Sequence, residues 1–157
     1  MEKEFSISPD GEKFPVPMEK DYEAEYERLQ ELVDYNRTLG REIVVVVGLG
    51  FVGAVMAAVI ADSTDESGNS GKFVIGMQRP SHRSFWKIPL INRGISPMKS
   101  EDPEVDELIQ RCVKEKKSLT ASFTYEALRF ADVVVVDVQC DYIKESLADV
   151  STGYVQL

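Results

Sequence analysis

The sequence has few of the residues that build metal centres or disulfide frameworks. Its 157 residues include two cysteines, Cys112 and Cys140, and one histidine, His82. Two thiols cannot make the framework of a small secreted domain, and zinc sites recruit several His or Cys ligands. We therefore expect reduced thiols and no metal ion.

Long apolar runs and an excess of positive charge are also missing. No hydrophobic stretch reaches the ~18 residues of a membrane span. The first residues lack the basic and apolar regions of a signal peptide. The net charge of −9 opposes binding to nucleic acids, which needs clustered Lys and Arg. These absences predict a cytoplasmic protein that binds neither membranes nor nucleic acids.

Much of the negative charge lies in residues 1–40, which carry eleven acidic and five basic residues. Residues 1–19 contain three prolines and no sustained period, which predicts an irregular arm. From Asp21 to Leu39, apolar residues recur at helical spacing, and Gly40 is placed to end that helix. Its other face is acidic. The helix either packs on its own domain or contacts a partner protein.

The strongest pattern runs from Glu42 to Asp62, where a β-branched strand, a glycine turn and an Ala-rich helix follow one another. Gly48, Gly50 and Gly53 fit G-x-G-x-x-G, the fingerprint of dinucleotide-binding folds. The first glycine permits the turn, the second lets a pyrophosphate approach the backbone, and the third lets the helix lie close to the strand. Unpaired N–H groups at the helix start then hold the phosphates. The candidate cofactor-binding loop is Gly48, Leu49, Gly50, Phe51, Val52 and Gly53; the alternative is a tight turn that binds nothing.

A second strand, Phe73 to Met77, ends at Gln78, where dinucleotide folds usually present an acidic residue to the adenosine ribose. An acidic residue accepts hydrogen bonds from the ribose hydroxyls and repels a 2′-phosphate. Gln78 can bond a hydroxyl without repelling a phosphate, and Arg79 can attract one. The choice between NAD and NADP therefore stays open, as does an ordinary solvated turn at these residues.

The rest of the chain alternates helices and strands. A short helix disturbed near Pro89 is followed by a helix capped by Asp102 that buries Cys112, which makes this thiol a core residue. Further elements are a strand at 119–122, a helix from Thr124 to Phe130, a strand at 132–138 that reads as buried, and a short helix at 142–148. His82 stands in a basic turn and is expected to be solvated.

This order predicts an α/β, Rossmann-type parallel sheet with strand order 3-2-1-4, truncated after the fourth strand and preceded by an extra N-terminal helix. The end of the fourth strand, Gln139, Cys140 and Asp141, should lie beside the glycine turn. Val138, Gln139 and Cys140 are candidate cofactor-binding residues there. Val133 to Val138 would form an exposed apolar edge unless another chain or a missing segment covers it. We therefore expect a homo-oligomer.

Three segments together resemble the N-terminal NAD-binding domain of UDP-glucose/GDP-mannose dehydrogenases. They are the glycine loop Gly48 to Gly53, the turn Asn92 to Pro97 with Glu101 after it, and Ala131 to Val136. The resemblance covers about residues 42–150 and implies an NAD-dependent oxidoreductase that oxidises the C6 alcohol of a UDP- or GDP-sugar to a carboxylate. The family works through a cysteine thiohemiacetal and thioester, with its catalytic Cys, Lys and Asn in a later part of the chain.

None of those catalytic positions is present here, and neither cysteine matches the nucleophile. The resemblance therefore implies a fragment, inactive alone, with a Rossmann domain at residues 41–157 after the N-terminal arm and helix at 1–40. The nucleotide sugar would be bound through absent domains. A stand-alone NAD(P)-sensing or protein-interaction module is the alternative.

Several residues depart from the family pattern. Gln78 replaces the ribose-binding Asp, and the family's following lysine corresponds to Lys87, with Arg83 as a substitute. The Val-Pro-Thr-Pro turn after the fourth strand becomes Val138, Gln139, Cys140 and Asp141. Cys140 would then stand where the family has a cofactor-contacting threonine.

Overall fold

The computed structural model describes residues 4–98, 102–138, 142–143 and 154–155. None of the helices in these parts is both long and apolar enough to cross a membrane. The strands are β1 (Phe5–Ile7), β2 (Lys13–Pro15), β3 (Glu42–Val47), β4 (Lys72–Met77), β5 (Leu119–Ser122), β6 (Val133–Val136), β7 (Tyr142–Ile143) and β8 (Tyr154–Val155). The α-helices are α1 (Asp21–Thr38), α2 (Phe51–Asp62), α3 (Lys87–Asn92) and α4 (Pro103–Gln110); a π-helical turn η1 (Arg111–Glu115) and a 3₁₀-helix η2 (Tyr125–Phe130) complete them.

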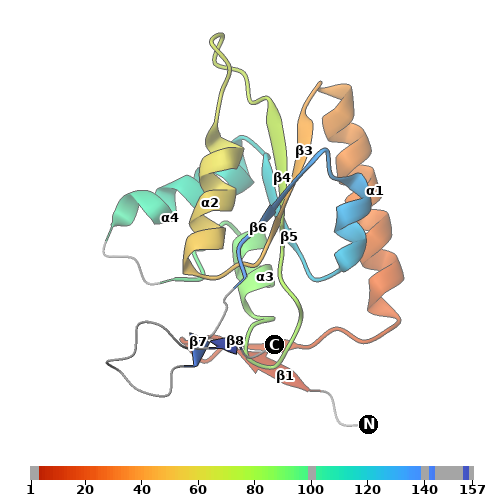
Figure 1. The fold of residues 1–157 in the computed structure, drawn as a ribbon, viewed down its shortest axis with the longest axis vertical. Coiled ribbons are helices and arrows are strands. Elements are labelled where there is room, and N and C mark those ends of the chain that lie inside the picture. Colours follow the sequence, from red (N-terminus) through yellow and green to blue (C-terminus); the bar gives the residue numbers. More distant parts are fainter. Residues whose placement is uncertain (1–3, 99–101, 139–141, 144–153, 156–157) are drawn as a thin grey trace.

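A four-stranded parallel sheet in the order β5-β4-β3-β6 forms the centre of the fold (Figure 1). In chain order these are the third, second, first and fourth strands of the sheet, so the predicted α/β, Rossmann-type order 3-2-1-4 is confirmed. Val45 of β3 lies opposite Ile75 of β4 and Val134 of β6. The continuous apolar runs of β3 and β4 follow from this position, because both faces of these strands are covered.

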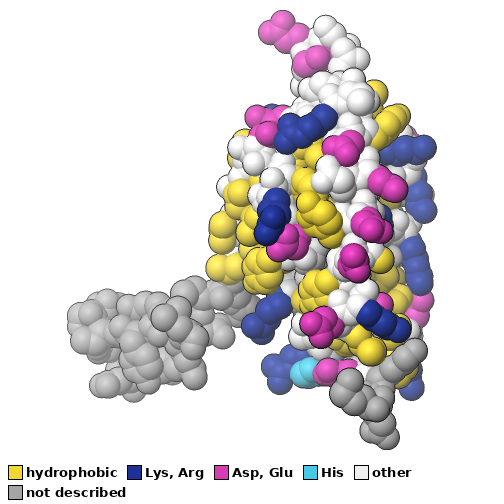
Figure 2. Space-filling view, turned by 90° about the vertical axis from the view of Figure 1, so that its right-hand side faces the viewer, with side chains coloured by type: hydrophobic (Ala, Val, Ile, Leu, Met, Phe, Trp, Pro, Cys, Tyr) yellow, Lys and Arg dark blue, Asp and Glu magenta, His cyan; other side chains and the backbone are white. Residues whose placement is uncertain are grey.

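Helices cover both faces of the sheet (Figure 1). On one face, Ala57 and Ala58 of α2 pack with Ile109 of α4 and with Cys112. On the other, Leu29 and other residues of α1 pack against β3 and β4 together with η2. The N-terminal helix therefore packs on its own domain, and Figure 2, which looks onto this side, shows acidic side chains along the exposed surface.

Residues 5–15 form a β-hairpin, so the irregular arm predicted for residues 1–19 was wrong in this part. β1 and β2 pair antiparallel, with Gly11 in the connection at a positive φ of 86°. Phe14 packs against Trp86 and Leu90, and the backbone N–H of Trp86 donates to Ser6 Oγ at 3.1 Å. The sequence did not predict these strands because three residues are too few to show an alternation of apolar and polar side chains. The apolar residues that pack against the hairpin also lie far along the chain.

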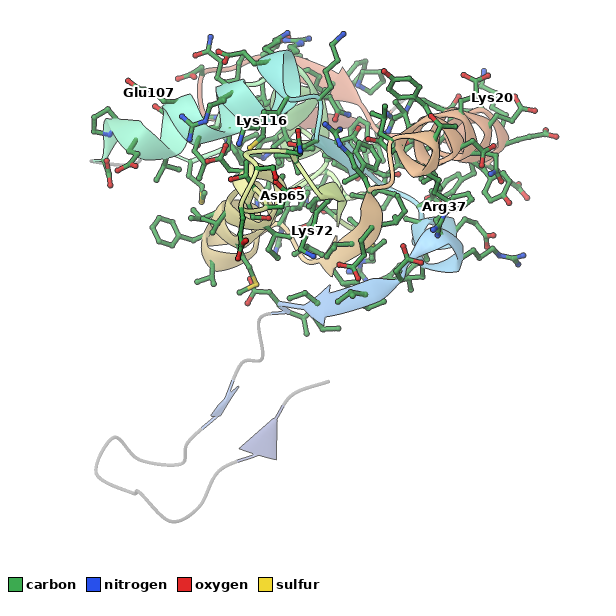
Figure 3. All side chains as sticks on the ribbon, turned by 90° about the horizontal axis from the view of Figure 1, so that it is seen from above. Lys20, Arg37, Asp65, Lys72, Glu107 and Lys116 are labelled. Carbon is green, nitrogen blue, oxygen red and sulfur yellow. The ribbon has the colours of Figure 1, made fainter. Side chains whose placement is uncertain are left out.

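β6 lies at the margin of the sheet, as Figure 3 shows from above. Val133, Val134 and Val136 are 41%, 48% and 64% exposed. The prediction of a buried strand was therefore wrong for these residues, whereas the predicted exposed apolar edge is present. A run of valines looks the same in a central strand and in an edge strand, because sequence alone does not show which neighbours are in place.

Two local predictions also need correction. Pro89 is the third residue of α3, where an N–H would have no helical acceptor, so the proline does not disturb the helix. Tyr142–Ile143 form a strand that pairs with β8 rather than the start of a helix, and the remainder of the predicted helix, 144–148, lies outside the described residues. The predicted caps are confirmed: Asp102 and Thr124 accept the N–H groups of Glu104 and Glu126 at 2.9 and 3.2 Å.

Candidate cofactor-binding site

A cavity of about 730 Å³ opens at the carboxyl ends of β3, β4 and β6. This is the place where open parallel sheets bind ligands, and the volume is within the usual range for such sites. Its lining residues come from those strand ends, the start of α2, the start of α3 and η2. They are Val47, Gly48, Gly50, Phe51, Val52, Met77, Gln78, Arg79, Lys87, Tyr125, Asp137 and Val138.

Packing within the chain explains two of the three motif glycines. Gly48 has a positive φ of 99°, and a Cβ there would overlap the backbone oxygen of Asp137. A Cβ on Gly53 would overlap the backbone oxygen of Gly48 and lie 2.8 Å from Oδ2 of Asp137. Both glycines let the turn, the helix and the segment after β6 approach one another, with or without a ligand.

Gly50 differs from both. It precedes α2 as its N-cap, with φ −72°, a value that any residue can adopt. A Cβ on Gly50 would meet no atom within 4 Å, and the residue lines the cavity. The fold therefore gives no reason for a glycine here. A pyrophosphate lying against the backbone does, because a side chain would occupy the space that the ligand needs.

Leu49 contributes its backbone rather than its side chain. Leu49 is 1% exposed, and its side chain packs against Gly76 of β4, where an added Cβ would lie 2.7 Å from Cδ2 of Leu49. The Leu49 N–H donates to Oε1 of Gln78 at 2.9 Å, and the Leu49 carbonyl accepts from Nζ of Lys87 at 3.1 Å. Both ends of this residue are thus held by predicted cofactor-binding side chains, which fixes the shape of the glycine loop.

Lys87 reaches the loop from the first residue of α3. Its partial burial lowers the pKa below the ordinary lysine value, because burial disfavours the charged form. Arg83, which was the alternative to Lys87, is exposed and is not among the described residues that line the cavity. Of these two cations, the structure therefore brings Lys87 to the glycine loop.

The other predicted site residues divide as follows. Phe51, Val52, Arg79 and Val138 line the cavity together with Gly48, Gly50, Gln78 and Lys87. Gly53 lies beneath the turn and does not line the cavity. Gln139 and Cys140 lie outside the described residues.

Sequence reasoning missed four lining residues: Val47 and Met77, which end β3 and β4, and Tyr125 and Asp137. Asp137 follows β6 directly, and its backbone N–H donates to the Val47 carbonyl at 2.8 Å. Tyr125 is the first residue of η2, shortly after β5, and is 55% exposed. The positions of Asp137 and Tyr125 in the sequence were a usable signal. Each residue lies at or shortly after the end of a predicted strand, and the carboxyl ends of parallel strands lie at the same edge of the sheet.

The residues that could suggest other chemistry lie elsewhere. Cys112 is buried, its Sγ is 3.4 Å from the Ala58 carbonyl, and burial raises the pKa of the thiol to about 11. It is a core residue, as predicted, and not an activated nucleophile. His82 is an exposed side chain whose Nδ1 lies 3.3 Å from Glu4 Oε1. Within the described ranges, no group of His, Cys, Asp and Glu is arranged to hold a metal ion.

The two other sequence motifs contribute residues that hold the fold together. Asn92 accepts the Ala121 N–H at 2.7 Å and donates to the Ala121 carbonyl at 3.0 Å, so its amide pairs with β5 as a neighbouring strand would. Asp132 accepts the Ile43 N–H at 2.8 Å and pairs with Arg37 of α1. The Ile43 N–H and then Arg37 hold the pKa of Asp132 below its ordinary value.

Comparison with known proteins gives structural matches. No protein-family model matches the chain, and no curated protein matches it. The fold is similar to that of an NDP-N-acetyl-D-galactosaminuronic acid dehydrogenase from Methanosarcina mazei Go1, with 30% identity, a TM-score of 0.58 and 73% of this chain covered. A UDP-glucose dehydrogenase from the hyperthermophilic archaeon Pyrobaculum islandicum matches at 21% identity over 62% of this chain, with a TM-score of 0.49.

The predicted resemblance to nucleotide-sugar dehydrogenases is confirmed, since the first of these structures is an NDP-sugar dehydrogenase. The matched part corresponds to 22% of the length of that protein and to 20% of the second. The chain thus spans about a fifth of the dehydrogenases that it resembles.

Proposed function

We propose that this chain is the nicotinamide-dinucleotide-binding part of a nucleotide-sugar dehydrogenase. The observation that carries the proposal is the glycine at position 50. Packing within the chain does not require a glycine there, whereas a pyrophosphate bound against the loop does. The similarity to an NDP-sugar dehydrogenase of 30% identity supports the same assignment. The dinucleotide would accept a hydride from the sugar.

Each lining residue has a role in this proposal. The first-turn N–H groups of α2 face the pyrophosphate, since a helix start leaves donors without helical partners. Gln78 and Lys87 hold the loop through Leu49, and Lys87 adds positive charge near the phosphates. Arg79 and Gln78 stand at the end of β4, where the adenosine ribose binds in such folds. Val138 follows β6 on the other side of the glycine turn.

The sugar chemistry belongs to the same proposal. The activity proposed is oxidation of the C6 alcohol of a UDP- or GDP-sugar to a carboxylate. The chain spans 22% of the length of the NDP-sugar dehydrogenase that it resembles, and we assign the sugar-binding and covalent steps to other parts of the enzyme. We expect the chain by itself to bind cofactor without turnover.

A binding titration tests the proposal. The chain has one tryptophan, Trp86, directly before Lys87. Its emission overlaps the absorption of a reduced nicotinamide, so bound NADH or NADPH should quench it by energy transfer. We expect saturable quenching by at least one of the two, reversed by excess ADP-ribose. After correction for the absorption of the cofactor itself, emission that shows no saturable quenching by either cofactor would contradict the assignment.

A further inference from the structure

Resting on the proposed function, we infer that Gln78 and Arg79 make this site selective for a dinucleotide with a 2′-phosphate on its adenosine ribose. The preferred cofactor is then NADP rather than NAD. The inference depends on which polar atoms the end of β4 presents to the cavity.

The amide of Gln78 has a fixed orientation. A backbone N–H can be met only by the oxygen of an amide, and the Leu49 N–H lies 2.9 Å from Oε1. The Nε2 group is then the polar atom left to meet a ligand. Within the chain it lies 3.5 Å from the Arg79 carbonyl, at the long limit of a hydrogen bond. Gln78 therefore offers the ribose a donor, whereas a carboxylate at this position would offer acceptors.

Arg79 adds a cation at the same place. Its side chain is exposed and lines the cavity beside Gln78. Its carbonyl accepts the Ser84 hydroxyl at 3.0 Å, which holds the backbone of the turn that follows β4. A guanidinium and an amide NH₂ both donate, and a phosphate monoester presents only acceptor oxygens and negative charge. The two residues thus match a 2′-phosphate better than a ribose hydroxyl.

The acidic residue of the cavity lies away from this end. Among the described lining residues, Asp137 alone is acidic, and it follows β6. In the order β5-β4-β3-β6, β3 lies between β4 and β6, which separates the two strand ends by about 10 Å. Asp137 lies against Gly48 and Gly53 instead. Its charge is therefore not placed to repel a phosphate bound at Gln78 and Arg79.

The test compares dissociation constants of NADPH and NADH, and of 2′,5′-ADP and 5′-ADP, for the intact chain. We expect each 2′-phosphorylated ligand to bind at least tenfold more tightly at low salt. In Gln78→Glu the carboxylate oxygen still accepts the Leu49 N–H, so the loop is kept while a negative charge faces the phosphate. This variant should lose the preference for NADPH. Arg79→Ala should weaken the binding of NADPH much more than the binding of NADH. Arg83→Ala, a neighbouring arginine that does not line the cavity, is the matched control.

Each result decides the inference. Equal or tighter binding of NADH by the unchanged chain overturns it and leaves the proposed function standing. A preference for NADPH that survives both Gln78→Glu and Arg79→Ala overturns the assignment to these residues. Binding of neither cofactor overturns this inference together with the proposed function.

Discussion

At the scale of single residues, the glycine loop separates structural requirements from functional ones. Gly48 and Gly53 are glycines because backbone oxygens stand where a Cβ would be. Gly50 has open space at the same position. Stability and binding should therefore respond to different members of one motif, which a pattern match on its own would treat alike.

Alanine substitutions test this separation. Gly53→Ala forces a Cβ onto the Gly48 carbonyl, and we expect it to lower the free energy of unfolding by about 1 to 3 kcal/mol. Gly50→Ala meets no atom and should change stability by less than about 1 kcal/mol. Urea unfolding of both variants measures the difference. An equal loss of stability in the two variants would show that the fold requires a glycine at position 50 and would remove the main argument for a ligand.

At the scale of elements, the end of α2 depends on an ion cluster. Asp62, its last residue, pairs with Arg111 at 2.8 Å and with Lys116 at 2.7 Å. A carboxylate at a helix C-terminus is unfavourable unless cations compensate it. The hydrogen bond from Arg111, followed by the contributions of Lys116, holds the pKa of Asp62 far below its ordinary value of 3.8 despite an opposing effect of burial.

This lowered pKa sets a pH dependence. A carboxyl whose pKa is depressed by folding stabilises the native state above its ordinary pKa, and this contribution is lost as the pH falls towards the folded value. Asp62→Asn should therefore be less stable than the unchanged protein at pH 7, by about 1 kcal/mol after solvent screening. This difference in the free energy of unfolding should become smaller below about pH 4. Chemical unfolding across this range, with the exposed loop variant Glu66→Gln as control, measures it; a gap that stays constant with pH would contradict the ion-pair explanation.

At the scale of the whole molecule, the two edges of the sheet are unlike. Asn92 and Arg28 bond the backbone of β5, which closes that edge. The other edge, β6, exposes valines, and Phe51, Val52 and Val59 of α2 are exposed as well. Figure 2 shows hydrophobic side chains on the surface beside the acidic helix. Exposed apolar strand edges favour pairing with another chain, and we therefore propose that the chain forms a homo-oligomer through β6.

Sedimentation velocity tests that proposal. We expect the chain to self-associate reversibly in the micromolar range, and Val134→Glu to shift it to the monomer because a charge would be buried at the paired edge. Tyr35→Glu, an exposed substitution on α1, is the matched control. One species of monomer mass for the unchanged chain would count against self-association through β6.

The sequence predicted the elements that have a long apolar pattern. It missed those that are stabilised by residues from distant parts of the same chain. β3, α2 and the strand order followed from apolar runs and chain alternation, and the glycine loop followed from its spacing. The hairpin of β1 and β2 did not, because Phe14 is stabilised by Trp86 and Leu90 from another region. The Gln78 bond to Leu49 also needed the structure, because no spacing rule predicts which side chain fixes a loop.

The most direct test of the central claim is cofactor binding by Gly50→Val and by Gly71→Val. Both glycines have unstrained φ values and no atom within 4 Å of an added Cβ, but only Gly50 lines the described cavity, and Gly71 precedes β4 at the opposite end of that strand. With both variants folded by circular dichroism, we predict that Gly50→Val loses binding of the reduced dinucleotide by at least a hundredfold and that Gly71→Val binds like the unchanged chain. Binding that survives in Gly50→Val would contradict the claim that a pyrophosphate lies against this loop.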